Sequence, residues 1–138
     1  MPITVEEEVV LLYALHRCGG NPTKSRATTY ILTNKLLIPR PNDEELVATG
    51  ETRIINRIAQ VRRNLRANKE LDMPHPGTWQ ITEKGKRRLF LAARMLHAQQ
   101  EEGLGFIDEL TSSRYSHEAF QHLRALGAEL AEQKRSTT

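Results

Sequence analysis

The sequence has few cysteines, few aromatic residues and no long hydrophobic run. Cys18 is the only cysteine among the 138 residues, which excludes an internal disulfide and a cysteine-rich zinc site. Aromatic residues make up 5% of the chain, and no segment approaches the about 20 consecutive apolar residues that a transmembrane helix requires. The first residues, MPITVEEE, also lack the basic and apolar regions of a signal peptide. We therefore expect a cytoplasmic protein without a membrane partner.

Motifs that would support catalysis or cofactor binding are absent as well. A chain of 138 residues is too short for most large catalytic architectures. Gly19-Gly20 is not followed by the Gly-Lys-Ser/Thr of a phosphate-binding loop. His117 and His122 are five positions apart, whereas two histidines share a metal on one helix face at a spacing of about four. The sequence thus predicts no enzyme, no metal and no small-molecule cofactor.

The charge of the chain is unevenly distributed. Twenty Lys and Arg residues against seventeen Asp and Glu residues give a formal net charge of +3. Residues 1–50 carry −1 (five basic, six acidic), residues 51–100 carry +7 (eleven basic, four acidic) and residues 101–138 carry −3 (four basic, seven acidic). A strongly cationic segment between two acidic ones is typical of a nucleic-acid surface, although a solvated charged face gives the same pattern.

Apolar spacing and capping residues predict a mostly helical protein. Thr4 and Glu7 have the spacing of a capping box, and Asn21-Pro22 has the form of an N-cap followed by proline. The stretches 71–73 and 78–81 flank a Pro/Gly turn, as in a β-hairpin. We expect helices over about 5–17, 22–35, 53–68, 83–100 and 116–134, and in the third of these Ile54, Ile58, Val61 and Leu65 share one face.

The helix over 53–68 carries the candidate DNA-binding residues. No acidic residue occurs from 52 to 68, so its polar side cannot form the mixed-sign pairs of an ordinary solvated face. Asn56, Gln60 and Arg63 point away from the apolar stripe, and these side-chain types bind adenine or guanine through paired hydrogen bonds. We therefore expect them to read bases. Seven further residues are expected to contact the DNA backbone: Thr52, Arg53, Arg57, Arg62, Arg66, Lys69 and, at the hairpin tip, His75.

The order of elements predicts a mainly α fold with a small β-hairpin, namely a winged helix-turn-helix followed by a C-terminal helical extension. Three helices, a hairpin and a fourth helix occupy residues 1–100, and the third helix fits a major groove about 12 Å wide. Residues 101–138 form the extension. Its last helix carries an apolar stripe that we assign to a homodimer contact, with packing on the fourth helix as the alternative: Phe120, Leu123, Leu126 and Leu130.

Two short motifs resemble a known family. Gly50-Glu51-Thr52-Arg53 opens the expected third helix, and Trp79-Gln80-Ile81-Thr82-Glu83-Lys84-Gly85 ends the hairpin. Both resemble the N-terminal winged-helix domain of the Mrr family of restriction proteins, and the resemblance extends over roughly residues 1–95. It implies a DNA-binding winged helix. Mrr proteins also carry a nuclease domain with a PD-(D/E)xK motif, for which residues 101–138 are too short.

These observations predict a double-stranded DNA-binding protein without catalytic activity. We expect it to act as a dimeric transcriptional regulator or as a DNA reader associated with restriction or defence. The alternatives are a protein–protein adaptor built on a winged helix and the DNA-recognition subunit of a restriction system. A metal-dependent nuclease that uses Asp72 and Glu83 is less favoured, because these residues lack the spacing of the nuclease motif.

Overall fold

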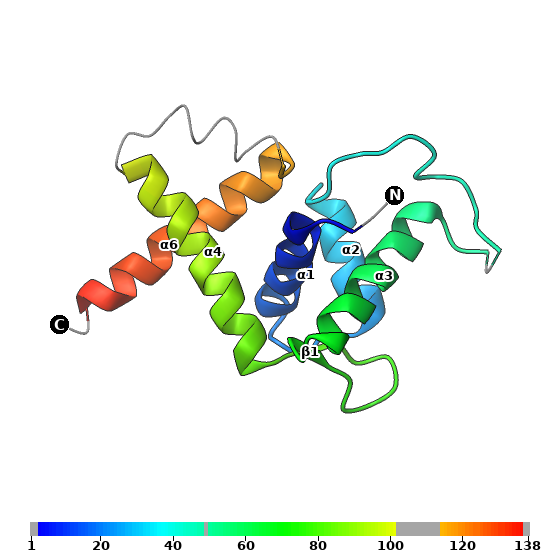
Figure 1. Ribbon diagram of the computed structural model, residues 1–138, viewed down its shortest axis with the longest axis horizontal. Coiled ribbons are helices and arrows are strands. Elements are labelled where there is room, and N and C mark those ends of the chain that lie inside the picture. The colour runs from blue at the N-terminus through cyan, green and yellow to red at the C-terminus, as the bar shows by residue number, and fades with distance from the viewer. Residues whose placement is uncertain (1–2, 49, 102–113, 137–138) are drawn as a thin grey trace.

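The computed structural model describes residues 3–48, 50–101 and 114–136. Within them lie five helices and a two-stranded antiparallel sheet, in the order α1 (Val5–Arg17), α2 (Lys24–Thr33), α3 (Arg53–Ala67), β1 (Leu71–Asp72), β2 (Gln80–Ile81), α4 (Glu83–Glu101) and α6 (His117–Ser136). Figure 1 shows α1, α2 and α3 grouped together with the hairpin at one end of the group, and α4 crossing α6 beside them. The predicted winged helix-turn-helix with a C-terminal helical extension is confirmed.

Both ends of α1 are fixed by the residues that the sequence singled out. The backbone N–H of Glu7 donates to Thr4 Oγ1 (3.1 Å) and that of Thr4 donates to Glu7 Oε1 (3.1 Å), which completes the capping box. At the other end the N–H of Gly20 donates to Leu15 O (2.8 Å). Gly19 adopts a φ of 93° there, a conformation open to glycine without strain.

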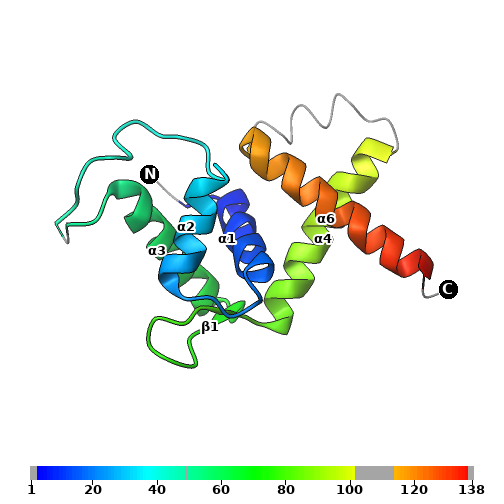
Figure 2. The ribbon, with the colours of Figure 1, turned by 180° about the vertical axis from the view of Figure 1, so that it is seen from behind.

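Helix α1 is the centre of the hydrophobic core. Every side chain from Val9 to Leu15 is buried, so the helix is enclosed on all sides. Helices α2, α3 and α4 and strand β2 all contact it. Figure 2 shows α1 enclosed between α2 and α4. The core therefore supports α3 from behind and leaves the opposite face of α3 to solvent.

The start of α2 differs from the sequence prediction. Its N-cap is Thr23 and not Asn21, and Thr23 has an extended backbone with a φ of −73° and a ψ of 162°. Residues 20–23 lie along one edge of the hairpin, beside residues 78–81, with an isolated bridge between Thr23 and Thr78. Two backbone hydrogen bonds of 2.8 Å hold this edge: Trp79 N–H to Pro22 O and Ile81 N–H to Gly20 O. The hairpin is thereby attached to the beginning of α2.

The hairpin is joined to α4 by the motif that resembled the Mrr family. Leu71 pairs with Ile81, and both side chains are buried. Thr82 Oγ1 accepts the backbone N–H of Gly85 (3.1 Å), as a helix cap does. A Cβ atom on Gly85 would lie 2.3 Å from Glu70 O, so a side chain there would collide with the backbone. The threonine and the glycine of the motif thus fix how α4 leaves the sheet.

Helix α6 packs against α4 inside this chain. A Cβ atom on Gly127 would lie 2.2 Å from Ala93 O, so a glycine allows the two helices to approach closely. The four apolar residues assigned to a dimer contact are buried in this packing, with exposed fractions of 6, 1, 2 and 8% for Phe120, Leu123, Leu126 and Leu130. That assignment is corrected: the stripe covers α4, which was the alternative.

The beginning and the middle of α6 also contact the winged helix. Ser116 Oγ donates to Lys35 O (2.8 Å), which ties the N-terminus of α6 to the end of α2. The rings of Tyr13 and His122 are stacked, with centroids 5.8 Å apart and planes inclined by 16°. The apolar residues of α6 consequently belong to the same hydrophobic core as those of α1. The boundary near residue 100 between a domain and an extension stays a prediction.

Candidate nucleic-acid interface

The face of α3 opposite the core carries the three residues expected to read bases. Ile58, Val61 and Leu65 are buried against α1, with exposed fractions of 1% or less, so the helix is oriented as its apolar stripe predicts. On the other side Arg63 is exposed, while Asn56 and Gln60 are half-buried. We call these three positions, Asn56, Gln60 and Arg63, the outer face of α3.

Two residues of the outer face line a small polar pocket. Asn56 and Gln60 share a volume of about 170 Å³ with residues from the loop before α3 and with two arginines of the helix: Arg40, Pro41, Asp43, Arg53 and Arg57. The side chains of Asn56 and Gln60 are therefore presented from a shallow recess. Arg63, one turn further on, lies outside it.

Arg57 does not face solvent, and its expected contact with the DNA backbone is corrected. Its side chain is 7% exposed and lies among carboxylates from two other segments. Nη1 lies 3.0 Å from Asp43 Oδ1, and Nε lies 3.0 Å from Glu7 Oε2 in an ion pair without hydrogen-bond geometry. Nη2 donates to Ile38 O (3.3 Å). Arg57 thus joins α3 to α1 and to the loop before α3.

The carboxylates around Arg57 are themselves held in place. Glu7 Oε1 accepts from Arg40 Nη2 at 2.7 Å, and Asp43 Oδ2 accepts the backbone N–H of Arg40 at 2.8 Å. Burial lowers the pKa of Arg57, with a further lowering from the charge of Arg40, and Asp43 and Glu7 oppose both effects. We call Glu7, Arg40, Asp43 and Arg57 the buried ion cluster. A buried charge is tolerated only when it is paired in this way.

Arg62 and Arg66 lie at the base of the hairpin. The Arg62 guanidinium lies 5.9 Å from the ring centroid of Trp79, and its Nη1 is 3.5 Å from Met73 Sδ. Burial lowers the pKa of Arg62, and the neighbouring charges of Arg63 and Arg66 lower it further. Arg66 is exposed and also approaches the Met73 sulfur, at 3.4 Å. Arg62 is therefore partly a packing residue, whereas Arg66 keeps its charge at the surface.

The other residues expected to contact the DNA backbone lie at the two ends of α3 and in the hairpin loop. Arg53 is exposed but paired with Glu45 (3.3 Å), and Thr52, the N-cap of α3, has a buried Oγ1 without a hydrogen-bond partner. Lys69 follows the C-terminus of α3, and His75 lies in the hairpin loop; both are exposed. These positions are consistent with surface contacts, which stay a prediction.

Sequence reasoning did not identify a second ion cluster that positions α4. Arg88 donates from Nη2 to Glu8 Oε1 (2.7 Å) and from Nη1 to Glu70 Oε1 (2.8 Å). Burial alone would lower the pKa of Arg88, but the hydrogen bonds and charges of Glu8 and Glu70 outweigh it and raise the pKa. The available signal was the run of three glutamates in the first turn of α1. The dipole of α1 favours acidic side chains near its N-terminus. Glutamates that are also buried or half-buried require cationic partners, and such partners were not sought in the sequence.

The described residues show no metal-binding group. No cluster of three or more His, Cys, Asp or Glu side chains suited to an ion occurs among them. Asp72 is exposed on β1 and Glu83 is exposed in the first turn of α4, where it pairs with Lys86 (3.4 Å). Across the same part of the chain, no helix has the length and apolar character to cross a membrane.

Comparison with known proteins supports the resemblance seen in the sequence motifs. A family model described as the Mrr N-terminal domain matches residues 9–90, more than half of the chain. No curated protein and no solved structure matches the chain. The matched range includes most of α1, all of α2 and α3, the hairpin and the first turns of α4. By its sequence, the chain belongs to the Mrr N-terminal domain family, which associates it with restriction systems and a DNA-binding fold.

Proposed function

We propose that this protein binds double-stranded DNA through α3 and the hairpin and has no catalytic activity of its own. The observation that carries the proposal is the outer face of α3. It presents two amide side chains, Asn56 and Gln60, and the arginine Arg63 on the side of α3 opposite the core. The helix contains no acidic residue, and the hairpin lies beside it. A helix of this kind fits a major groove, and its side chains match the hydrogen-bond patterns of adenine and guanine.

The biological role that we propose follows from the family to which the chain belongs. The chain reads DNA as part of a restriction or defence system, or regulates transcription, as a homodimer. Because the apolar stripe of α6 is used within the chain, a dimer must form through other residues. Sedimentation velocity of the free protein and of its DNA complex measures this state directly.

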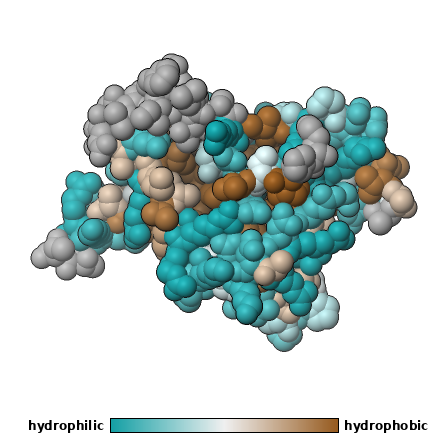
Figure 3. All heavy atoms as spheres, in the orientation of Figure 1, coloured by the Kyte–Doolittle hydropathy of each residue, from teal (hydrophilic) through white to brown (hydrophobic). Residues whose placement is uncertain are grey.

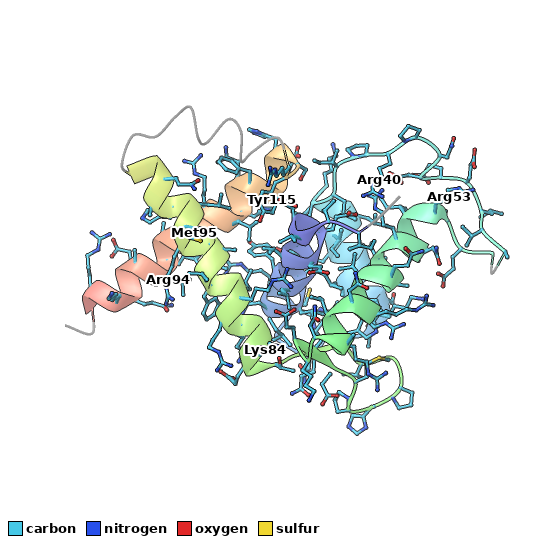
Figure 4. The ribbon with its side chains drawn as sticks, in the orientation of Figure 1. Arg40, Arg53, Lys84, Arg94, Met95 and Tyr115 are labelled. Carbon is cyan, nitrogen blue, oxygen red and sulfur yellow. The ribbon has the colours of Figure 1, made fainter. Side chains whose placement is uncertain are left out.

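Selection of bound duplexes from a random pool, with and without methylated cytosine, tests sequence reading. We expect an enriched motif, and we expect Arg63→Ala to weaken binding to that motif by about 1–3 kcal/mol while broadening preference at one base pair. Arg94→Ala is the matched control, because Arg94 is an exposed arginine on α4, away from the outer face of α3 (Figure 4). Equal losses in both variants would show that only charge matters and would contradict base reading.

Two assays on the same protein distinguish DNA binding from the two alternatives, a protein–protein adaptor and a nuclease. Size-exclusion chromatography with a selected duplex is expected to give a shifted complex, whereas a protein–protein adaptor would elute unchanged. Incubation of plasmid with Mg²⁺ is expected to leave the DNA intact. Cleavage that Asp72→Asn or Glu83→Gln abolished would instead favour the nuclease hypothesis.

A further inference from the structure

The two ends of α3 differ in how their cations are used. At the N-terminal end Arg53 pairs with Glu45 (3.3 Å), and Lys24, nearby on α2, pairs with Glu51 (2.9 Å). The adjoining loop adds the exposed carboxylate of Glu44. A polyanion approaching this end would meet acidic side chains whose cationic neighbours are already paired.

The C-terminal end of α3 has the opposite character. Arg63, Arg66 and Lys69 are exposed, and none of them forms an ion pair with the residues that the structure describes. The beginning of α4 lies against this end, because Lys84 Nζ donates to Asn68 O (2.8 Å) and Thr82 Oγ1 donates to Lys69 O (2.8 Å). The cations of two helices are therefore brought together here.

Lys69 has an unusual backbone conformation. Its φ is 62°, in the left-handed region that favours glycine or asparagine after the end of a helix. A lysine at such a position adds strain and, with an exposed side chain and no ion pair among the described residues, gains no visible contact in return. Glycine would adopt this conformation without strain, so replacing Lys69 by glycine removes the charge and keeps the backbone conformation.

Lys84 and Arg87 continue the cationic surface along α4. They lie one turn apart, both are exposed, and no acidic residue occurs from 84 to 100. Figure 4 shows Lys84 at the hairpin end of α3 and Arg53 at the other end. Figure 3 shows that the surface over α3 and the first turns of α4 is mostly hydrophilic.

We infer that a phosphate-contacting patch, formed by Lys69 together with Lys84 and Arg87 of α4, extends the DNA interface beyond α3 and the hairpin. The inference rests on the proposed binding of double-stranded DNA. It assigns a DNA strand to the junction of α3 and α4. It also gives the first turns of α4 a role in binding besides their packing on α1.

Lys69→Gly tests the patch without damaging the fold, because glycine adopts a φ of 62° without strain. Lys35→Gly is a matched control: Lys35 is exposed, follows α2 with a φ of 55°, and lies beside the start of α6, where its carbonyl accepts from Ser116 Oγ. Binding of a 25-base-pair duplex is measured against NaCl concentration for both variants, for Lys84→Gln and for the wild type. Thermal unfolding is followed in parallel.

We expect Lys69→Gly and Lys84→Gln each to reduce the slope of log K against log [salt] by about 0.9, as the loss of one phosphate contact does. Lys69→Gly is expected to melt no lower than the wild type, and Lys35→Gly to keep the wild-type slope. Equal slopes in Lys69→Gly and Lys35→Gly would overturn the inference while leaving DNA binding intact. Absence of binding by the wild type would instead overturn the proposed function.

Discussion

At the scale of single residues, two arginines one turn apart on α3 occupy contrasting environments. The side chain of Arg53 is 56% exposed and pairs with a carboxylate that is equally exposed. The side chain of Arg57 is 7% exposed and lies between Glu7 and Asp43. Pairs exposed to water contribute little to stability, whereas removal of one member of a buried pair leaves an uncompensated charge. Of these two arginines, Arg53 is therefore a surface residue, whereas Arg57 stabilises the fold.

Arg57→Ala is predicted to lower the free energy of unfolding by about 3–5 kcal/mol, because Glu7 and Asp43 would remain buried without their shared partner. Arg53→Ala, the matched control, is expected to change it by less than about 1 kcal/mol. Urea unfolding monitored by circular dichroism measures both variants. Similar effects of the two substitutions would contradict the buried ion cluster.

Two partly buried histidines predict how stability depends on pH. Burial, followed by the charge of Arg17, lowers the pKa of both His16 and His122 from the ordinary value of 6.5. His16 packs edge-on against Phe90, with ring centroids 5.2 Å apart. The unfolded chain then binds protons more readily than the folded one, so stability is complete above pH 6.5 and falls as the pH drops from there toward the folded-state pKa values.

Urea unfolding at several pH values between 7.5 and 5 measures this effect. His16→Phe/His122→Phe is expected to flatten the pH dependence, because it removes both titrating rings and retains aromatic packing. An unchanged pH dependence in the double variant would assign the effect to other groups.

At the scale of elements, the contact between α4 and α6 requires a glycine. Gly127→Ala would place a Cβ atom 2.2 Å from Ala93 O and 2.7 Å from His97 Cβ. Although alanine favours a helix over glycine by about 1 kcal/mol, we expect a net loss of about 1–3 kcal/mol from the forced separation of the helices. Thermal unfolding checks this, with Gln121→Ala on the exposed side of α6 as the control. A melting temperature that stays at the wild-type value in Gly127→Ala would contradict this packing.

The sequence predicted elements well where their signals were local. Each of these signals acts on residues close to it in the chain. Thr4 caps the helix that follows it, and Ile58, Val61 and Leu65 orient the helix that contains them. The Pro/Gly turn forms the hairpin around it. The N-cap of α2 was misplaced because Asn21 lies in a segment that pairs with β2, and that pairing joins residues more than fifty positions apart. Local residue preferences contain no information about such a partner.

The sequence predicted the candidate site in outline, but it assigned one residue, Arg57, to the wrong role. Helical periodicity placed Asn56, Gln60 and Arg63 opposite the apolar stripe, and in the structure Arg63 is exposed while Asn56 and Gln60 are half-buried. Periodicity also placed Arg57 on the flank of the polar side, and only the positions of Glu7 and Asp43 in space explain why it is buried. The stripe of α6 presented the same difficulty, since an apolar helix face does not specify whether α4 or a second chain covers it.

At the scale of the whole molecule, one hydrophobic core connects the part that we propose binds DNA with the C-terminal helix. Helix α1 supports α3 on one side and α4 on another, and α6 reaches the end of α2 through Ser116. The basic residues of the segment 51–100 lie in α3, at Lys69 and in α4, and the structure assigns part of their charge to internal ion pairs. What remains exposed is concentrated near the junction of α3 and α4.

The salt dependence of duplex binding tests the central claim most directly. Fluorescence anisotropy of a labelled duplex, titrated with the wild-type protein at 50–300 mM NaCl, yields the slope of log K against log [salt]. If exposed cations of α3 and α4 contact three to five phosphates, the slope will be about −2.7 to −4.5. A slope near zero, or no binding at the lowest salt concentration, would contradict the assignment of this surface to DNA.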